Sequence, residues 1–306
     1  MPAQVPFAIK GDWDHVAKAF GLQHYSGNQP CDHCRCNKAG PQSLWPNNFL
    51  PDAGWKQQMI TPEQWRAANP NPHWLFQAFP YLSNANVEPD ELHVVFLGTS
   101  MHLLGSVLWL LVYRLLPNSP ADNMNRIWSD IAELYRERRT PAQYSNIELK
   151  SFIDPAQPRA AYPKLKGKGA EIKHLAPILL EIWRRHQRPG NDRDAWVLEC
   201  LEHQCALQSI ADESPHDLFL SDAQAATFRS TLDGYLRMYS RLAAAADAAG
   251  DLLFTVAPKH HLYWHLGQRA GWLHPRRGAC FLDEDFVRRI KGIVEACTVH
   301  RLNAPA

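Results

Sequence analysis

A short run of cysteines near the start of the chain is the first feature with evident chemical potential. Cys31 and Cys34 form a C-x-x-C pair, and Cys36 follows two residues later. Such thiols are either reduced structural residues or half of a tetrahedral zinc site, which needs four ligands. The chain has 7 cysteines in 306 residues, which is sparser than in a small disulfide-stabilised secreted domain. The pattern gives no role to Cys36.

A second pair of possible ligands lies in a histidine-rich segment at residues 258–266. His261 and His265 are spaced i and i+4, so both imidazoles face the same side of a helix. His260 with His265 is an alternative pair. Surface or core histidines would explain either pair without a metal. Taken together, however, Cys31, Cys34, His261 and His265 predict a Cys2His2 zinc site that joins the two ends of the chain.

Acidic residues stand at two positions where metal-dependent hydrolases place carboxylates. Asp12 follows a short apolar run expected to be a strand and precedes an expected helix that ends at Gly21. Glu284 belongs to the acidic triplet 283–285, directly before another expected helix. Acids at a helix start also simply complement the helix dipole. Asp90 and His93 allow metal or phosphate binding, but a capped helix start explains them slightly better.

The segment 156–190 is the best candidate for contact with a nucleic-acid backbone. It holds eight basic residues against two acidic ones in a chain whose net charge is only +1. Gly167 and Gly169 would allow the backbone to approach a phosphate closely. A solvated helix face is the alternative reading of such a charge run. The candidate DNA contacts are Lys164, Lys166, Lys168, Lys173, Arg184 and Arg185.

Composition and hydrophobic periodicity describe the framework that must position these groups. Hydrophobic residues make up 45% and charged residues 21%, which excludes wholesale disorder and a uniformly basic coat for DNA. Residues 1–40 are expected to hold a strand, a helix and the C-x-x-C pair, and residues 41–91 to be irregular and rich in Trp and Pro. Residues 92–250 are expected to be helical, and residues 251–306 to hold a strand at 252–256, the histidine pair and the acidic triplet.

The apolar stretch 94–113 is nearly long enough to cross a bilayer. Because Gly98 and His102 interrupt it, we expect a buried helix and no membrane partner. No basic region followed by an apolar one opens the chain, so no signal peptide is visible. We therefore expect an intracellular, reducing compartment and not secretion. The expected fold class is mainly α with a few short strands.

Four blocks of the sequence, in order, resemble the CACTA-superfamily (En/Spm-like) DDE transposases. The segment 11–34 is similar to their Gly-Asp to Cys-x-x-Cys block, and 90–98 resembles their Asp-x-Met-His block, with Leu92 in place of Met. The segment 258–266 is similar to their Lys-x-His-x-x-x-His block, and 281–285 lies where the family has its last catalytic Glu. The combination is more specific than any single block.

The resemblance implies a ribonuclease-H-like α/β core interrupted by a large helical insertion. In that family two Asp and one Glu bind two Mg²⁺ or Mn²⁺ ions for DNA strand cleavage and transfer, and a zinc site supports the core. Asp12 then matches the second catalytic Asp and Glu284 the final Glu. Cys31, Cys34, His261 and His265 match the zinc ligands. The resemblance also implies that the protein binds DNA, is located in the nucleus and forms a homo-oligomer.

One departure from the family pattern affects the expected activity. The first catalytic Asp of the family lies before the block that begins at Gly11, and residues 1–10 contain no acid. The chain is therefore expected to be the C-terminal part of a catalytic region, truncated and inactive alone. The alternatives are a non-enzymatic, zinc-stabilised module that binds DNA or protein, and a plain helical interaction protein without zinc.

Overall fold

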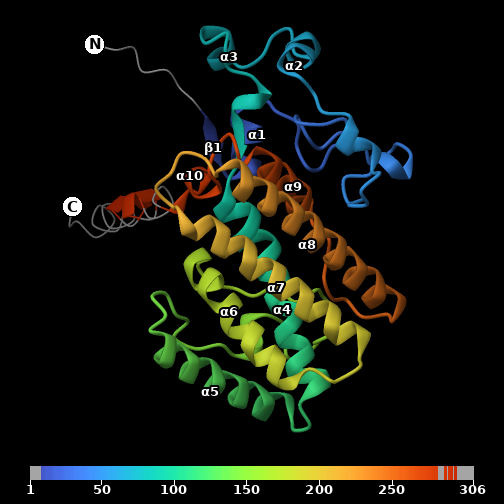
Figure 1. The fold of residues 1–306 in the computed structure, drawn as a ribbon, viewed down its shortest axis with the longest axis vertical. Coiled ribbons are helices and arrows are strands. Elements are labelled where there is room, and N and C mark those ends of the chain that lie inside the picture. The colour runs from blue at the N-terminus through green and yellow to red at the C-terminus, as the bar shows by residue number, and fades with distance from the viewer. Residues whose placement is uncertain (1–7, 282–285, 288, 292, 295–306) are drawn as a thin grey trace, which may run out of the picture.

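The computed structural model describes residues 8–281, 286–287, 289–291 and 293–294, and these form a mainly helical fold with one small sheet (Figure 1). The strands are β1 (Ile9–Gly11) and β2 (Val87–Pro89). The helices are α1 (Trp13–Phe20), α2 (Pro62–Ala68), α3 (Trp74–Ala78), α4 (Met101–Leu110), α5 (Pro120–Arg138), α6 (Gly169–His186), α7 (Asp192–Glu213), α8 (Asp222–Ala248), α9 (Pro258–Arg269) and α10 (Pro275–Gly278). Residues 286–287, 289–291 and 293–294 are also helical.

The sheet consists of β1 and β2, which pair in parallel with Ile9 opposite Val87 and Gly11 opposite Pro89. The strand and helix expected around Asp12 are confirmed as β1 and α1, and α1 ends at Gly21 in the left-handed conformation. β2 lies at the end of the region expected to be irregular. Its three residues are too few to show a period, and its last one is a proline, which pattern reasoning assigns to loops.

A central helix spans Leu92–Leu115, with a kink at Leu97 and π-helical turns at Leu92–Ser100 and Leu111–Leu115 on either side of α4. By length and composition it could cross a membrane. Its most apolar window, however, is 89% buried inside the fold, where the helix packs against α5, α6 and α9. Packing on several sides is the reason that this helix is apolar around its whole circumference.

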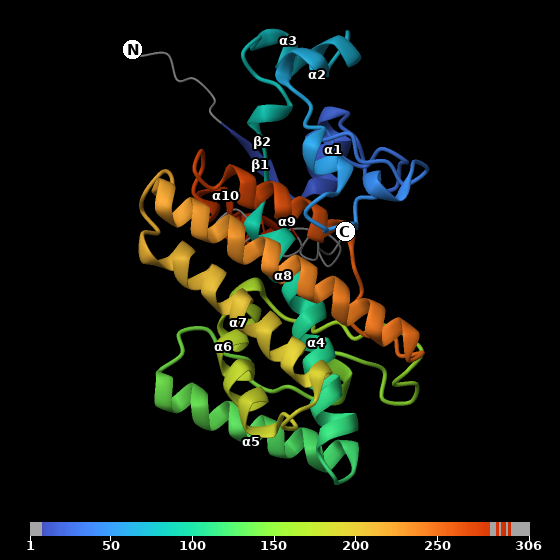
Figure 2. The ribbon, with the colours of Figure 1, turned by 45° about the vertical axis from the view of Figure 1, so that its right-hand side comes forward.

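The remaining long helices confirm the expected helical region between residues 92 and 250. α5 begins at the Ser119–Pro120 pair, where the Ser119 side chain accepts a hydrogen bond from the backbone N–H of Asp122. Its buried side includes Ile127, Ile131 and Leu134. α6, α7, α8 and α9 each pack against the next in sequence, and Figures 1 and 2 show them side by side from two directions.

The strand expected at residues 252–256 is wrong. Among the described residues this segment has no sheet partner, and Phe254 adopts a positive φ of 56°, which lies outside the β region. The backbone N–H of Phe254 donates to Ser106 Oγ at 3.0 Å, and the Tyr239 hydroxyl donates to the carbonyl of Thr255 at 3.2 Å. The run is apolar because it crosses the core, and a short apolar run does not by itself distinguish a buried loop from a strand.

Candidate metal centre and the strand-end acids

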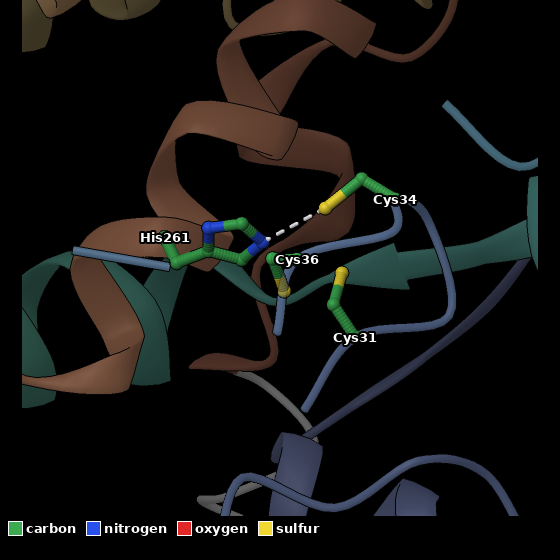
Figure 3. Close-up of side chains that lie close together, drawn as sticks. All are labelled: Cys31, Cys34, Cys36 and His261. Carbon is green, nitrogen blue, oxygen red and sulfur yellow. Dashed lines mark hydrogen bonds between the residues drawn. The ribbon is translucent and has the colours of Figure 1, made fainter. Parts of the chain in front are cut away.

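Three cysteines from one loop meet a histidine of α9 in the protein interior. The ligand atoms of Cys31, Cys34, Cys36 and His261 all lie within 4.8 Å of one another, and all four residues are buried (Figure 3). In Figure 3 the three thiols of the loop and the imidazole of α9 lie close together. Thiolate sulfur and imidazole nitrogen are the ligands that zinc prefers. This cluster could bind a metal such as zinc.

The distances between neighbouring donor atoms fit one tetrahedral ion. Cys34 Sγ lies 3.3 Å from His261 Nε2. Around zinc, with Zn–S near 2.3 Å and Zn–N near 2.0 Å, sulfur and nitrogen ligands stand about 3.5 Å apart. The side chains therefore need only small movements to hold the ion.

Two neighbouring groups fix the tautomer and the orientation of the His261 ring. Its Nδ1–H donates to the carbonyl oxygen of Pro46 at 3.0 Å, which leaves the lone pair of Nε2 directed at the cysteines. A hydrogen bond from the far nitrogen to a carbonyl is the usual outer support of a metal-binding histidine. The ring of the buried Trp55 packs against His261 with 4.3 Å between ring centroids. Both contacts hold the imidazole in a metal-binding orientation.

His265 lies beside this cluster as the i+4 spacing predicted. Its Nε2 is 3.4 Å from Cys31 Sγ and 3.1 Å from His261 Nε2. Five donor groups thus surround a site that offers four positions. His260, the alternative to His261, faces elsewhere: its ring stacks near Tyr239 and its Nδ1 lies 3.2 Å from the carbonyl of Ala257.

Cys36 is the functional candidate that sequence reasoning missed. It is fully buried and shares the cluster with Cys31, Cys34 and His261. The available signal was its position two residues after Cys34, because so short a spacing keeps the third thiol near the first two. A search for two separate pairs of ligands passes over such a residue.

The electrostatics of the cluster favour a bound cation. Burial opposes ionisation of Cys31, but hydrogen bonds from Cys34 and Cys36 and the imidazoles of His265 and His261 outweigh it, so the Cys31 pKa falls well below its usual value. Burial, together with the negative charge on Cys31, raises the Cys34 pKa. The hydrogen bond to Cys31 raises the pKa of Cys36. The buried site accommodates one thiolate, that of Cys31. Ionisation of the Cys34 and Cys36 thiols as well requires a cation between the three sulfur atoms.

The Trp-rich region holds the cysteine loop in place. Cys34 forms an isolated antiparallel bridge with Met59, flanked by hydrogen bonds from Arg35 N–H to Gln58 and from Ile60 N–H to His33, each 2.9 Å long. The indole N–H of the buried Trp65 donates to Asp32 Oδ1 at 2.9 Å. Residues 55–65 therefore form the outer wall of the centre.

Asp12 and Asp90 each directly follow a strand of the parallel sheet. Since Gly11 pairs with Pro89, the two aspartates emerge side by side at the same edge. Asp90 is buried, and its carboxylate accepts hydrogen bonds from the N–H groups of Leu92 at 3.0 Å and Cys280 at 2.9 Å and from His93 Nδ1. Asp12 precedes α1 without a capping bond from its side chain. Glu284 lies outside the described residues.

Two ion pairs with buried carboxylates also join β2 and the start of the central helix to α9 and α10. Arg269 Nε contacts Glu88 Oε2 and Arg276 Nη1 contacts Glu91 Oε1, each at 2.6 Å. Burial raises the pKa of Glu88 to about 7, although Arg269 opposes the rise. These pairs link α9 and α10 to the same sheet edge, and no sequence pattern identified them.

The structure divides the predicted DNA contacts into two groups. Lys173 pairs with Asp212 at 2.9 Å, Arg184 with Glu202 at 2.7 Å, and Arg185 with Glu181, all on the helical body. Lys164, Lys166 and Lys168 are exposed on the extended segment before α6. Lys168 lies 4.0 Å from Glu171.

The chain matches no known protein family model, no curated protein and no solved structure.

Proposed function

We propose that this chain is the zinc-stabilised part of a catalytic core that cleaves and transfers DNA strands, of the kind found in CACTA-like DDE transposases. The observation that carries the proposal is the meeting of the cysteine loop with His261 and His265, in a fold whose strand β1 is followed directly by Asp12. A carboxylate at the end of a parallel strand is well placed to hold a catalytic cation.

The zinc centre has a structural role in this proposal. Its ligands come from the two ends of the chain, so a bound zinc ion fixes α9 against the loop that follows α1. The same attachment holds the segment after α10 near β2, where the N–H of Cys280 donates to Asp90. Asp12 and the region that leads to Glu284 are thereby kept at one edge of the sheet.

The proposed chemistry uses Asp12 and Glu284 as ligands for Mg²⁺ or Mn²⁺, which would polarise a phosphate and activate water or a DNA 3′-hydroxyl. The carboxylate of Asp12 makes no capping bond to α1 and is available for this role. Asp90 is held by its own hydrogen bonds and orients His93 and the chain at Cys280. The proposal also includes a ribonuclease-H-like core with DNA as its substrate. It further includes a nuclear location and assembly with other copies of the chain.

Binding of Mn²⁺ separates this proposal from its alternative. Titration of the zinc-loaded protein, followed by electron paramagnetic resonance of free Mn²⁺, should show a site that Asp12→Asn and Glu284→Gln weaken. Asp14→Asn is the matched control, because Asp14 lies on α1 in an exposed ion pair with Lys18. Equal Mn²⁺ binding by the wild type and Asp12→Asn would contradict a catalytic role for Asp12.

The second candidate is a zinc-stabilised module without catalytic activity that binds DNA or protein. In its favour, the possible metal cluster within the described part of the chain consists of cysteines and a histidine and contains no carboxylate. Stoichiometric zinc combined with no measurable Mn²⁺ site would favour this module over the nuclease core.

A further inference from the structure

One face of the central helix carries a group of nitrogen donors that the zinc centre does not use. Gly98 and Gly105 stand seven residues apart, about two turns, and so lie on the same face. A Cβ at Gly98 would lie 2.8 Å from Lys259 Cδ, and a Cβ at Gly105 would lie 3.0–3.1 Å from the backbone of residues 163–165. The absence of side chains at these glycines allows Lys259 and the lysine-bearing segment to pack beside each other on the helix.

Lys259 is held at this face by the irregular part of the helix. Leu97 has non-helical angles of φ −87° and ψ 15°, and its carbonyl oxygen accepts a hydrogen bond from Lys259 Nζ at 3.2 Å. An ammonium group has three donors, so this bond leaves two for a ligand. Burial lowers the Lys259 pKa; Asp12 and Asp90 counteract the shift, whereas Lys164 adds to it. Lys259 therefore interacts electrostatically with Asp12, with Asp90 and with Lys164.

His102 completes the group between the two lysines. It lies on the turn between Gly98 and Gly105, and its ring forms a hydrogen bond to the backbone of Pro163. Burial lowers its pKa to about 4, with the positive charges of Lys164 and Lys259 adding to the shift, so the ring is neutral at neutral pH. Its buried Nδ1 has no hydrogen-bond partner among the described protein groups. Because the ring N–H faces Pro163, this Nδ1 is an acceptor; it is costly to leave unpaired, and a hydroxyl or N–H donor of a ligand would satisfy it.

Beyond Lys164, exposed groups continue away from this face. The segment 163–168 is pinned by hydrogen bonds from Leu165 N–H to Met101 and from Lys166 N–H to Ser151, while Lys164, Lys166 and Lys168 point outward. Lys164 and Lys166 line a surface hollow of about 420 Å³ together with Tyr162, which is 42% exposed. The hollow also contains Asp154, so its charge is not purely positive.

We propose that Lys259 and Lys164 form a phosphate-binding site on either side of His102, and that a DNA strand runs from it over Lys166 toward the hollow at Tyr162. Two ammonium groups suit the oxygens of one phosphate, and lysines that recur every second residue follow a backbone of repeated phosphates. The exposed Tyr162 ring offers a stacking surface for an unpaired base, which favours a single strand. This inference rests on the proposed function for the identity of the partner, and it places the strand end next to Asp12.

The test is the salt dependence of binding to a fluorescent single-stranded 20-nucleotide DNA. Lys164→Ala and Lys259→Met should each lower affinity several-fold and reduce the slope of log K against log salt by about 0.7. The double variant Lys173→Ala/Arg184→Ala is the matched control, because it removes two cations that are already paired on the helical body. Thermal unfolding and zinc content confirm that each variant is folded, and Lys259→Met keeps the aliphatic stem that packs on Gly98.

Unchanged slopes for both single variants, or equal losses in the control, would overturn the site. Displacement of the DNA by polyglutamate at matched charge would also overturn it, since it would point to an acidic protein partner. The outcome is independent of the Mn²⁺ experiment: loss of DNA binding in Lys164→Ala with no Mn²⁺ site would support the phosphate site while rejecting the nuclease core.

Discussion

Cys34 Sγ lies 3.3 Å from His261 Nε2, although 227 residues separate the two in sequence. The contact joins the loop after α1 to the first turns of α9, and the whole helical body lies between them in the chain. A contact that closes so long a loop carries a large entropic cost, which a strong metal–ligand interaction offsets better than a weak contact between thiol and imidazole. A metal bound at this cluster would therefore couple the stability of the fold directly to its architecture.

We expect the purified protein to contain one zinc ion per chain. Cys31→Ser and His261→Ala should each lower the zinc content and lower the melting temperature by several degrees, because each removes one of the five donor groups and His265 must then complete the ligand set in a poorer geometry. Atomic emission spectroscopy and thermal unfolding measure both effects. Cys205→Ser is the control, since Cys205 is a half-buried thiol on α7 away from the cluster. Retention of full zinc content in both ligand variants would disprove the centre.

The fourth ligand can be identified by replacing zinc with Co²⁺. Because Cys31, Cys34, Cys36 and His261 are mutually within 4.8 Å, we expect three thiolates on the ion and His265 hydrogen-bonded to Cys31. Thiolate-to-cobalt absorption should then fall by about a third in Cys36→Ser and stay nearly constant in His265→Ala. The opposite pattern would restore the Cys2His2 set that the histidine spacing predicted.

Trp55 should matter for metal binding although it offers no ligand atom. Its ring packs on His261 and lies 4.8 Å from the ring of Trp264, and it is fully buried. Trp55→Ala should lower the free energy of unfolding by about 3–5 kcal/mol. It should also weaken zinc binding, because the His261 imidazole loses the indole ring that packs against it. Denaturant unfolding and competition with a chromophoric chelator measure the two effects. Trp74→Ala, at an exposed position, should change neither; comparable losses there would contradict the role of Trp55.

Glu88 should make stability depend on pH. Its pKa rises from 4.5 to about 7 on folding, mainly through burial, so the folded state keeps a proton that the unfolded state loses. The resulting stability is fully present below pH 4.5 and is lost as pH rises through about 7, with a total change of about 3 kcal/mol. The free energy of unfolding, measured by denaturant titration from pH 4.5 to 8, should fall less steeply in Glu88→Gln than in the wild type. Parallel curves would show that Arg269 keeps Glu88 ionised throughout.

The local features of the sequence were sufficient to predict most of the helices. Ser119 and Pro120 mark the start of α5 by capping chemistry, and the i, i+4 spacing of His261 and His265 places both on one face of α9 whatever surrounds them. The same reasoning located β1 and Asp12. It failed at β2 and at residues 252–256, because three-residue strands and buried loops are defined by their partners and not by a period of their own.

The sequence by itself determined which residues carry suitable donor atoms and which of them share a helix face or a loop. Only the tertiary structure decided which of these groups meet. It brought Cys36 into the cluster, turned His260 away from it, placed Asp90 beside Asp12, and paired Lys173, Arg184 and Arg185 with acids while Lys164 stayed exposed. The physical reason is that propensity, capping and helix periodicity act over a few residues, whereas ligand geometry and ion pairing depend on packing between segments far apart in the chain.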